Sequence, residues 1–172
     1  MPLRRAGRPP GEVLALLPRG DRALDAVVLA DGRWAVVART VLLVAGADGA
    51  GGVARPWTDV DRGSLDPEAG GLTVHWVDGT RTALPLVDSG AAARWARSFR
   101  ERVQQSVVRS LPVTGLPGRP ATPPRVALRR AADGTLFTQL LGDARVDLAD
   151  PATLAAVVAV EDELRSSAGL PR

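Results

Sequence analysis

The spacing of apolar residues changes once along this chain, and that change limits the folds open to it. From Leu24 to Val87 apolar residues recur at every second position, which is typical of β-strands with one buried face. From Ser89 to Arg109 they recur every three to four positions, which predicts an amphipathic helix. A series of strands followed by one long helix indicates an α+β fold.

We expect seven short strands before this helix. Their ranges are 24–30, 33–38, 40–45, 53–57, 60–65, 72–77 and 81–87. Asp31-Gly32 and Asp78-Gly79 predict tight turns between neighbouring strands, because glycine adopts positive φ without strain. The helix would pack an apolar stripe on the strands. That stripe is Ala92, Trp95, Phe99, Val103 and Val107.

Composition divides the chain into four parts. They are an N-terminal segment with a short helix (1–22), the strands and their helix (23–110), a linker (111–124) and an extension (125–172). The linker holds five prolines, which predict extended chain because proline has no amide hydrogen to donate.

The extension predicts a small β-hairpin followed by a C-terminal helix. Strands are expected at 126–130 and 135–141, with a third at 145–148. Asp150 and Pro151 then predict a helix start, with the aspartate as cap and the proline in the first turn. Four residues of this helix are expected to face a core: Leu154, Val157, Val158 and Leu164. A hairpin this small is marginal alone, so the helix should pack on it.

Three segments resemble those of pleckstrin-homology-like domains of bacteria. They are Arg33 to Arg39, Arg55 to Val60 and Leu72 to Trp76. The layout as a whole resembles that of small actinobacterial proteins. The resemblance implies a seven-stranded β-barrel with an amphipathic helix capping one open end. It implies a fold and carries no activity with it, because one fold serves many functions.

Charge and composition argue against several classes of protein. The 22 basic residues are all arginine, and with 19 acids the net charge is only +3, which argues against a nucleic-acid partner. The absence of cysteine excludes disulfides and zinc–thiolate sites. The apolar stretch 34–47 is interrupted by Arg39 and is shorter than a membrane span, so we expect no integral membrane protein. No secretory signal is evident, and a cytoplasmic location is expected.

One cluster of basic residues stands apart from any acid. Between residues 111 and 130 the chain has four arginines and no carboxylate. The four are Arg119, Arg125, Arg129 and Arg130. They are candidate binding residues for an anionic ligand or a peripheral membrane surface, since clustered arginines attract such groups.

Catalytic residues are few. His75 is the single histidine, and it alternates with Leu72, Val74 and Trp76, so it is expected on the outer face of a strand with no evident nucleophile beside it. Asp59 is expected on a solvated face rather than in a metal site. We therefore predict no catalytic residue, no metal and no cofactor.

These observations favour a non-enzymatic binding or scaffolding module. A protein partner of unknown identity would contact an exposed sheet edge or the basic linker region. The alternative is a peripheral membrane or anionic-ligand binding module that uses the basic linker region. A small enzyme is the third hypothesis.

Overall fold

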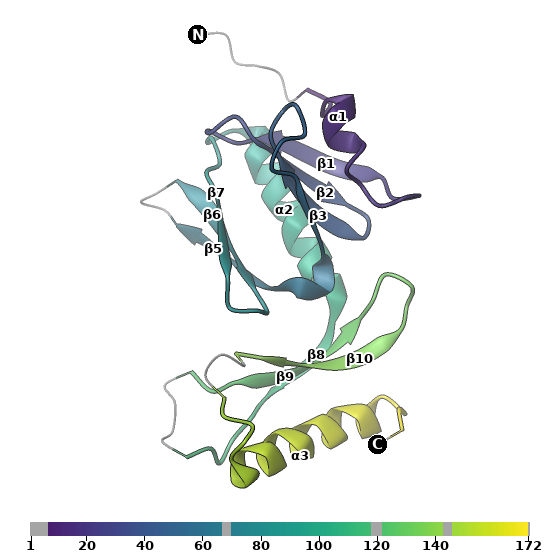
Figure 1. Ribbon diagram of the computed structural model, residues 1–172, viewed down its shortest axis with the longest axis vertical. Helices are drawn as coiled ribbons and strands as arrows, with labels where there is room; N and C mark the ends of the chain where they lie inside the picture. Colours follow the sequence, from purple (N-terminus) through teal and green to yellow (C-terminus); the bar gives the residue numbers. More distant parts are fainter. Residues whose placement is uncertain (1–6, 67–69, 118–121, 143–145, 172) are drawn as a thin grey trace. The chain divides into compact units, whose positions relative to one another are not determined.

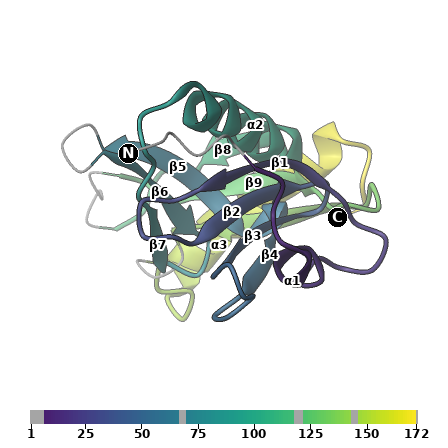
Figure 2. The ribbon, with the colours of Figure 1, turned by 90° about the horizontal axis from the view of Figure 1, so that it is seen from above.

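The computed structural model describes residues 7–66, 70–117, 122–142 and 146–171 of the 172-residue chain. The chain forms two compact units. One unit holds Met1–His75 with Arg81–Val103, and the other holds Trp76–Thr80 with Gln104–Arg172. Figure 1 and Figure 2 show the elements of both units in two views, coloured along the chain.

The helices and strands follow one another in an order close to the predicted one. They are α1 (Gly11–Leu14), β1 (Ala23–Val28), β2 (Trp34–Ala38), β3 (Val41–Ala45), β4 (Val53–Pro56), η1 (Trp57–Asp59), β5 (Val60–Asp66), β6 (Gly71–Trp76), β7 (Arg81–Leu84), α2 (Gly90–Ser106), β8 (Val107–Pro112), β9 (Arg125–Arg130), β10 (Leu136–Leu141) and α3 (Pro151–Ser167). All seven strands expected before the long helix are present, each within a few residues of its predicted bounds.

The prediction of one seven-stranded barrel is wrong. The fold is α+β, but its strands form separate antiparallel sheets in the orders β1-β2-β3-β4, β5-β6-β7 and β10-β9-β8, and the described residues include no closed barrel. The chain leaves the first sheet at Pro56, where the short helix η1 follows β4 at once. The Trp57 indole N–H donates to the Ala38 carbonyl at 3.0 Å and fixes this departure.

The four-stranded sheet is buried on both faces at its centre. Every residue of β2 and β3 is buried, although strands with one covered face would alternate. One face packs on α1 and forms the cluster Val13, Trp34, Val36, Leu43 and Ala45. The short helix α1 is thereby held by apolar packing, as an isolated helix of its length would have to be.

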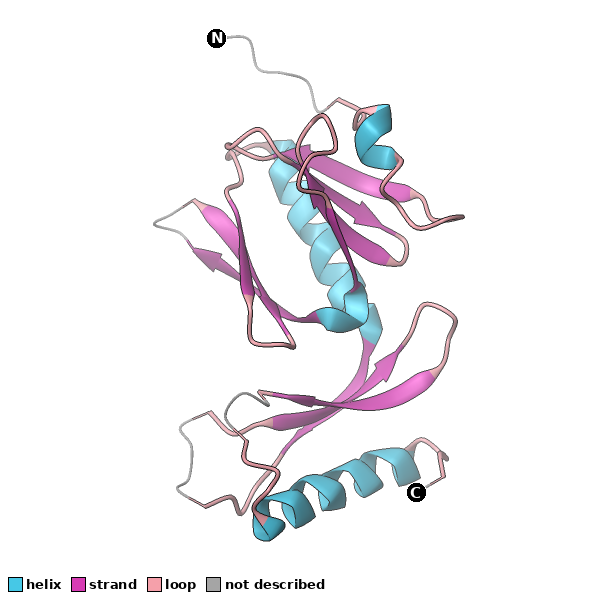
Figure 3. Cartoon of the chain, viewed as in Figure 1, coloured by secondary structure: helices cyan, strands magenta, loops and turns pink. Residues whose placement is uncertain are grey.

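Helix α2 brings aromatic side chains into the core. Trp95 is 0% exposed and stacks on Phe99 with ring centroids 5.6 Å apart, while Trp57 meets Phe99 edge-on at 5.7 Å. Ser89 caps the helix by accepting from the Ala92 amide at 3.1 Å. All four tryptophans are buried, and Trp95 lies on the apolar helix stripe where the sequence placed it. Figure 3 shows α2 as the long helix of this unit.

Strand β8 begins where the sequence predicted helix and linker. Helix α2 ends at Ser106 rather than near residue 109, and β8 then continues to Pro112. Pro112 is tolerated because β8 is an edge strand, where an amide hydrogen is not needed on the open side. Val113 is buried, and its amide donates to the Pro124 carbonyl at 2.8 Å. The first residues of the predicted linker therefore belong to a sheet.

The second unit is a three-stranded sheet with α3 on one face. Their shared cluster is Val113, Val126, Leu128, Val157 and Leu164, which confirms the predicted packing of helix on hairpin. Asp150 caps α3 by accepting from the Thr153 hydroxyl at 2.6 Å and from the Thr153 amide at 2.8 Å, and these bonds lower the pKa of its carboxyl. Leu154 and Val158 are exposed, so their predicted core positions are wrong.

Two further points complete the fold. The third strand predicted at 145–148 begins at a residue outside the described part of the chain, and residues 146–148 are not in a strand. Within the described residues, no helix is both long and apolar enough to cross a membrane.

Candidate functional site

An open groove of about 540 Å³ lies between the N-terminal segment and β1. Its lining comes from the segment before α1, from α1 and the turn after it, from β1 and from one residue of α2. The lining residues are Gly7, Arg8, Pro9, Leu14, Leu17, Asp21, Arg22, Ala23, Leu24, Asp25, Ala26 and Arg94. Because β1 is the first strand of its sheet, the groove follows an open sheet edge.

The apolar part of the groove has a simple origin. Leu14 and Leu17 lie in and just after α1, whose Val13 packs on β2 and β3 and so holds the helix beside the sheet. Leu24 lies in β1 and is 41% exposed, although it is a large apolar residue. An exposed leucine at a strand edge, opposite two more, makes an apolar lining that a partner could cover.

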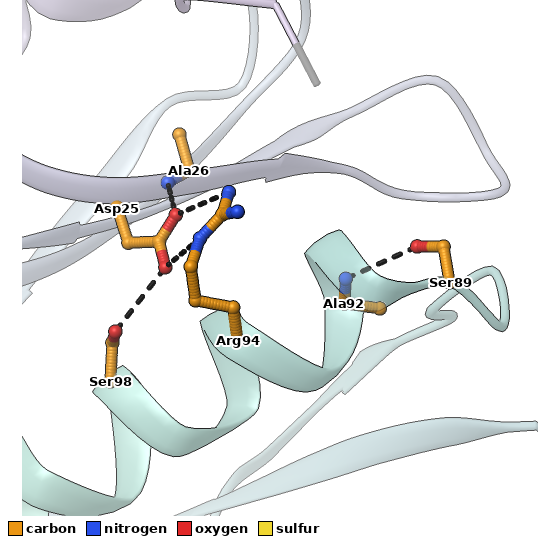
Figure 4. A network of polar contacts seen from close by, with 6 residues as sticks. All are labelled: Asp25, Ala26, Ser89, Ala92, Arg94 and Ser98. Atoms are coloured by element: carbon orange, nitrogen blue, oxygen red, sulfur yellow. Dashed lines mark hydrogen bonds and ion pairs between the residues drawn. The ribbon is translucent and has the colours of Figure 1, made fainter. Parts of the chain in front are cut away.

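Asp25, one of the lining residues, joins β1 to α2 (Figure 4). Its carboxylate accepts from Arg94 at 3.2 and 3.4 Å, from the Ser98 hydroxyl at 3.2 Å and from the Ala26 amide at 2.9 Å. The Asp25 side chain is only 9% exposed, whereas that of Arg94 is 59% exposed. The negative charge of Asp25 is therefore neutralised by Arg94 within the fold.

Asp21, which also lines the groove, is held by backbone amides and a hydroxyl group. Its carboxylate accepts from the amides of Arg22, Arg39 and Thr40 and from the Thr40 hydroxyl. Partial burial alone would raise its pKa, but these hydrogen bonds outweigh it and lower the pKa below the usual value. Asp21 is therefore ionised at neutral pH and fastens the chain before β1 to the turn between β2 and β3.

Two other arginines of the groove are not neutralised in this way. Arg8 and Arg22 both line it and both are exposed. Neither forms an ion pair with any residue that the structure describes. The groove thus combines an apolar lining with unneutralised positive charge, because both of its carboxylates are held by internal donors.

His75 has a partner that the sequence did not reveal. The Ser64 Oγ lies 2.9 Å from His75 Nε2, between β5 and β6. Burial lowers the pKa of His75, Arg62 and Arg81 lower it further, and Asp61 opposes them. The imidazole is therefore neutral at pH 7. Ser64 and His75 lie in two strands, 60–65 and 72–77, that the sequence predicts as neighbours. The distance between their side chains depends on the strand register, which local sequence patterns do not fix.

The Ser64–His75 pair has the spacing of a nucleophile and its base. In catalytic triads a third group orients the base through the other ring nitrogen. Among the described residues no hydrogen bond to Nδ1 of His75 is present. The pair lies on the outer face of a sheet rather than in the groove, so its geometry does not favour acyl transfer.

The four predicted basic residues are not brought together. Arg119 lies outside the described residues. Arg125 and Arg129 alternate along β9 on the face opposite Val126 and Leu128, whereas Arg130 follows on the other face. Arg125 is exposed and donates to the Ser110 hydroxyl at 2.9 and 2.5 Å.

Arg129 is the exception among them because it is 0% exposed. Its guanidinium donates to the Ser106 hydroxyl at 2.9 Å and to Gln139 Oε1 at 3.1 Å. A buried guanidinium in such contacts has a structural role, since an external anion could not reach it without rearrangement of the sheet. The predicted basic cluster is thus divided between two sheet faces and a buried position.

Carboxylates do not gather into a cation site in the part of the chain that is described. No group of three or more histidine, aspartate or glutamate side chains placed to hold a metal ion occurs there. Asp59 accepts from Arg55 at 3.4 Å, and Asp61 pairs with Arg62 at 2.9 Å. Both are therefore occupied by arginines.

Comparison with known proteins adds no relative. No family model, no curated protein and no solved structure matches the chain. The resemblance to pleckstrin-homology-like domains therefore remains a prediction, and function has to be argued from the groove itself.

Proposed function

We propose that this chain is a non-enzymatic binding module that holds an extended, acidic and partly apolar segment of a partner protein along β1. The observation that supports it is the groove beside this edge strand, with leucines in its lining and two arginines that have no ion pair among the described residues. The partner is defined by that chemistry and not by name.

Three physical terms would contribute to such binding. An edge strand offers backbone donors and acceptors to an added strand, and on β1 the Ala26 amide is excepted because it already donates to the Asp25 carboxylate. Leu14, Leu17 and Leu24 would cover alternate apolar side chains of the segment, which supplies affinity. Arg8 and Arg22 would bind carboxylates through charge-assisted hydrogen bonds, which favours an acidic segment over a neutral one.

Nothing in the lining is equipped for covalent chemistry. Its described residues include no serine, histidine or cysteine, and its two aspartates are held by backbone amides, Arg94 and hydroxyl groups. A cytoplasmic location is part of the same proposal and is supported by composition alone.

A random peptide library displayed on phage tests the proposal. Selection on the full chain should enrich peptides that alternate apolar residues with aspartate or glutamate. Synthetic versions should bind the wild type and should bind Leu24→Glu at least tenfold more weakly, because the change places a carboxylate beside the acidic segment. Arg22→Gln should also weaken binding and reduce its dependence on salt.

Matched controls separate the groove from a general effect of charge. Val53 is 54% exposed in β4, the other edge strand of the same sheet, so Val53→Glu should leave peptide binding unchanged. Arg39 is exposed and does not line the groove, so Arg39→Gln is the control for Arg22→Gln. Peptides that lose no affinity on Leu24→Glu, or lose as much on Val53→Glu, would contradict the proposal.

A further inference from the structure

A second cluster of polar side chains lies away from the groove, on the outer face of the β5-β6-β7 sheet. Strand β6 buries Leu72, Val74 and Trp76 and turns Thr73 and His75 to the other side. His75 and Arg81 are directly paired in the register of β6 with β7. Side chains of such cross-strand partners share a face and lie within about 5 Å at their Cβ atoms.

Strand β5 adds two more polar groups to this face. The Ser64 hydroxyl lies 2.9 Å from Nε2 of His75. Arg62 precedes Ser64 by two residues, which places both on one face of the strand. The cluster therefore consists of two guanidinium groups, an imidazole and a hydroxyl.

One of the two arginines in the cluster has an ion-pair partner among the described residues, and the other has none. Arg62 pairs with Asp61 at 2.9 Å, yet its side chain is 60% exposed. Arg81 is exposed and has no ion pair among the residues that the structure describes. The charged groups that act on His75 are Arg62 and Asp61 from β5 and Arg81 from β7, and the two arginines lower its pKa beyond the effect of burial. The two arginines make the potential at the imidazole positive, and a bound anion would offset that potential.

We propose that Arg62, Ser64, His75 and Arg81 form a binding site for a phosphate group, free or carried as the monoester of a small molecule. Arg81 would supply paired N–H donors and the one positive charge without an ion pair among the described residues of the cluster, the Ser64 hydroxyl a further donor, and Arg62 the N–H groups that its Asp61 partner leaves exposed. His75 would become a donor through both nitrogens when protonated. This site is independent of the β1 groove.

The single histidine of the chain makes a direct test available. The ring signals of His75 in an NMR pH titration need no assignment, and they can be followed in phosphate and in chloride at equal ionic strength. Binding and protonation are linked, so an anion that prefers the imidazolium raises the pKa of His75. A tenfold preference corresponds to a rise of about one in that pKa at saturation.

Two variants decide whether the site is the one proposed. Arg81→Gln removes the unpaired guanidinium and should abolish most of the difference between phosphate and chloride. Arg97→Gln removes an exposed arginine of α2 and should leave the difference as in the wild type. Each variant is compared with itself in the two salts, because losing Arg81 changes the pKa of His75 in chloride as well.

Glycerol phosphate should act as inorganic phosphate does. The proposal is overturned if His75 titrates identically in phosphate and chloride, or if Arg81→Gln responds as the wild type does. It is also overturned if only vesicles of phosphatidic acid bind, because a membrane surface and not a small phosphate would then be recognised.

Discussion

Gly63 is the position where the packing of α2 can be tested most sharply. A Cβ atom added at Gly63 would lie 2.6 Å from Cε1 and 3.3 Å from Cζ of Phe99. The Phe99 ring is 3% exposed and is bounded by Trp95 on one side and Trp57 on the other, so it has little room to move. Gly63→Ala should therefore overpack this core.

The expected size follows from two opposing terms. Overpacking a filled core costs about 1–3 kcal/mol. Gly63 does not have a positive φ, so alanine also restricts the unfolded chain and returns about 0.4–1 kcal/mol. The middles of these two ranges give a net loss of about 1 kcal/mol. If the unit of Met1–His75 with Arg81–Val103 unfolds by itself, each kcal/mol lowers its melting temperature by about 4–8 °C, the range for domains of about 60–100 residues.

Urea unfolding followed by tryptophan fluorescence measures the loss. Gly90 is the matched control, because a Cβ there would meet nothing within 4 Å and its φ is not positive. Gly90→Ala should be neutral or stabilising. Combining Gly63→Ala with Phe99→Leu should cost less than the sum of the single changes, since leucine vacates the contested space. If Gly63→Ala unfolds at the same urea concentration as the wild type, or if the two changes are additive, the described contact is wrong.

Two more predictions concern stability. Trp95→Ala should lower the free energy of unfolding in urea by about 3–5 kcal/mol, because it leaves a cavity. Trp95→Phe should cost clearly less, because phenylalanine keeps most of the packing and removes a buried indole N–H that has no acceptor among the described residues. Equal losses for the two variants would refute this account. Asp21→Asn should destabilise the chain at pH 7. The folded-state pKa of Asp21 is lowered, so its contribution is complete above the unfolded value of about 3.9 and is lost as the pH falls through the folded value. Urea midpoints of wild type and variant should therefore differ by a constant amount above about pH 4 and approach each other as the pH falls below it. A constant difference down to pH 2 would contradict the assignment.

Local pattern predicted the strands well because a period of two is a property of each segment alone. Every residue of β2 and β3 could be assigned to a strand from its sequence. Whether β4 pairs with β5 is not a local property, and the turn at η1 separates the two sheets that the sequence suggested as one barrel. The prediction of a closed barrel came from the resemblance to pleckstrin-homology-like domains, and the structure corrects it.

Site residues were harder to predict for the same reason. Arginines 125, 129 and 130 form a cluster in sequence, yet a strand distributes neighbours to opposite faces, and burial of one then depends on what covers that face. The hydrogen bond between Ser64 and His75 depends on strand register. The groove depends on which face of the first sheet α1 packs against, and the sequence of this short helix does not determine that face.

The division into two parts leads to the last prediction. A chain cut after residue 124 keeps β8 but loses β9, its only neighbour in the sheet order. Val113, which is 1% exposed and packs with residues of β9 and α3, would lose that cover. A chain cut after Ser106 ends with α2 and lacks β8 altogether.

The longer fragment should therefore associate more than the shorter one, although it is closer to the full chain. An open strand with uncovered apolar residues is a template for pairing with another copy. Light scattering after size exclusion should give 1–124 a larger mass relative to its chain than either 1–106 or the full chain gives. If 1–124 is no more associated than 1–106, an uncovered β8 does not cause association, and the prediction is wrong.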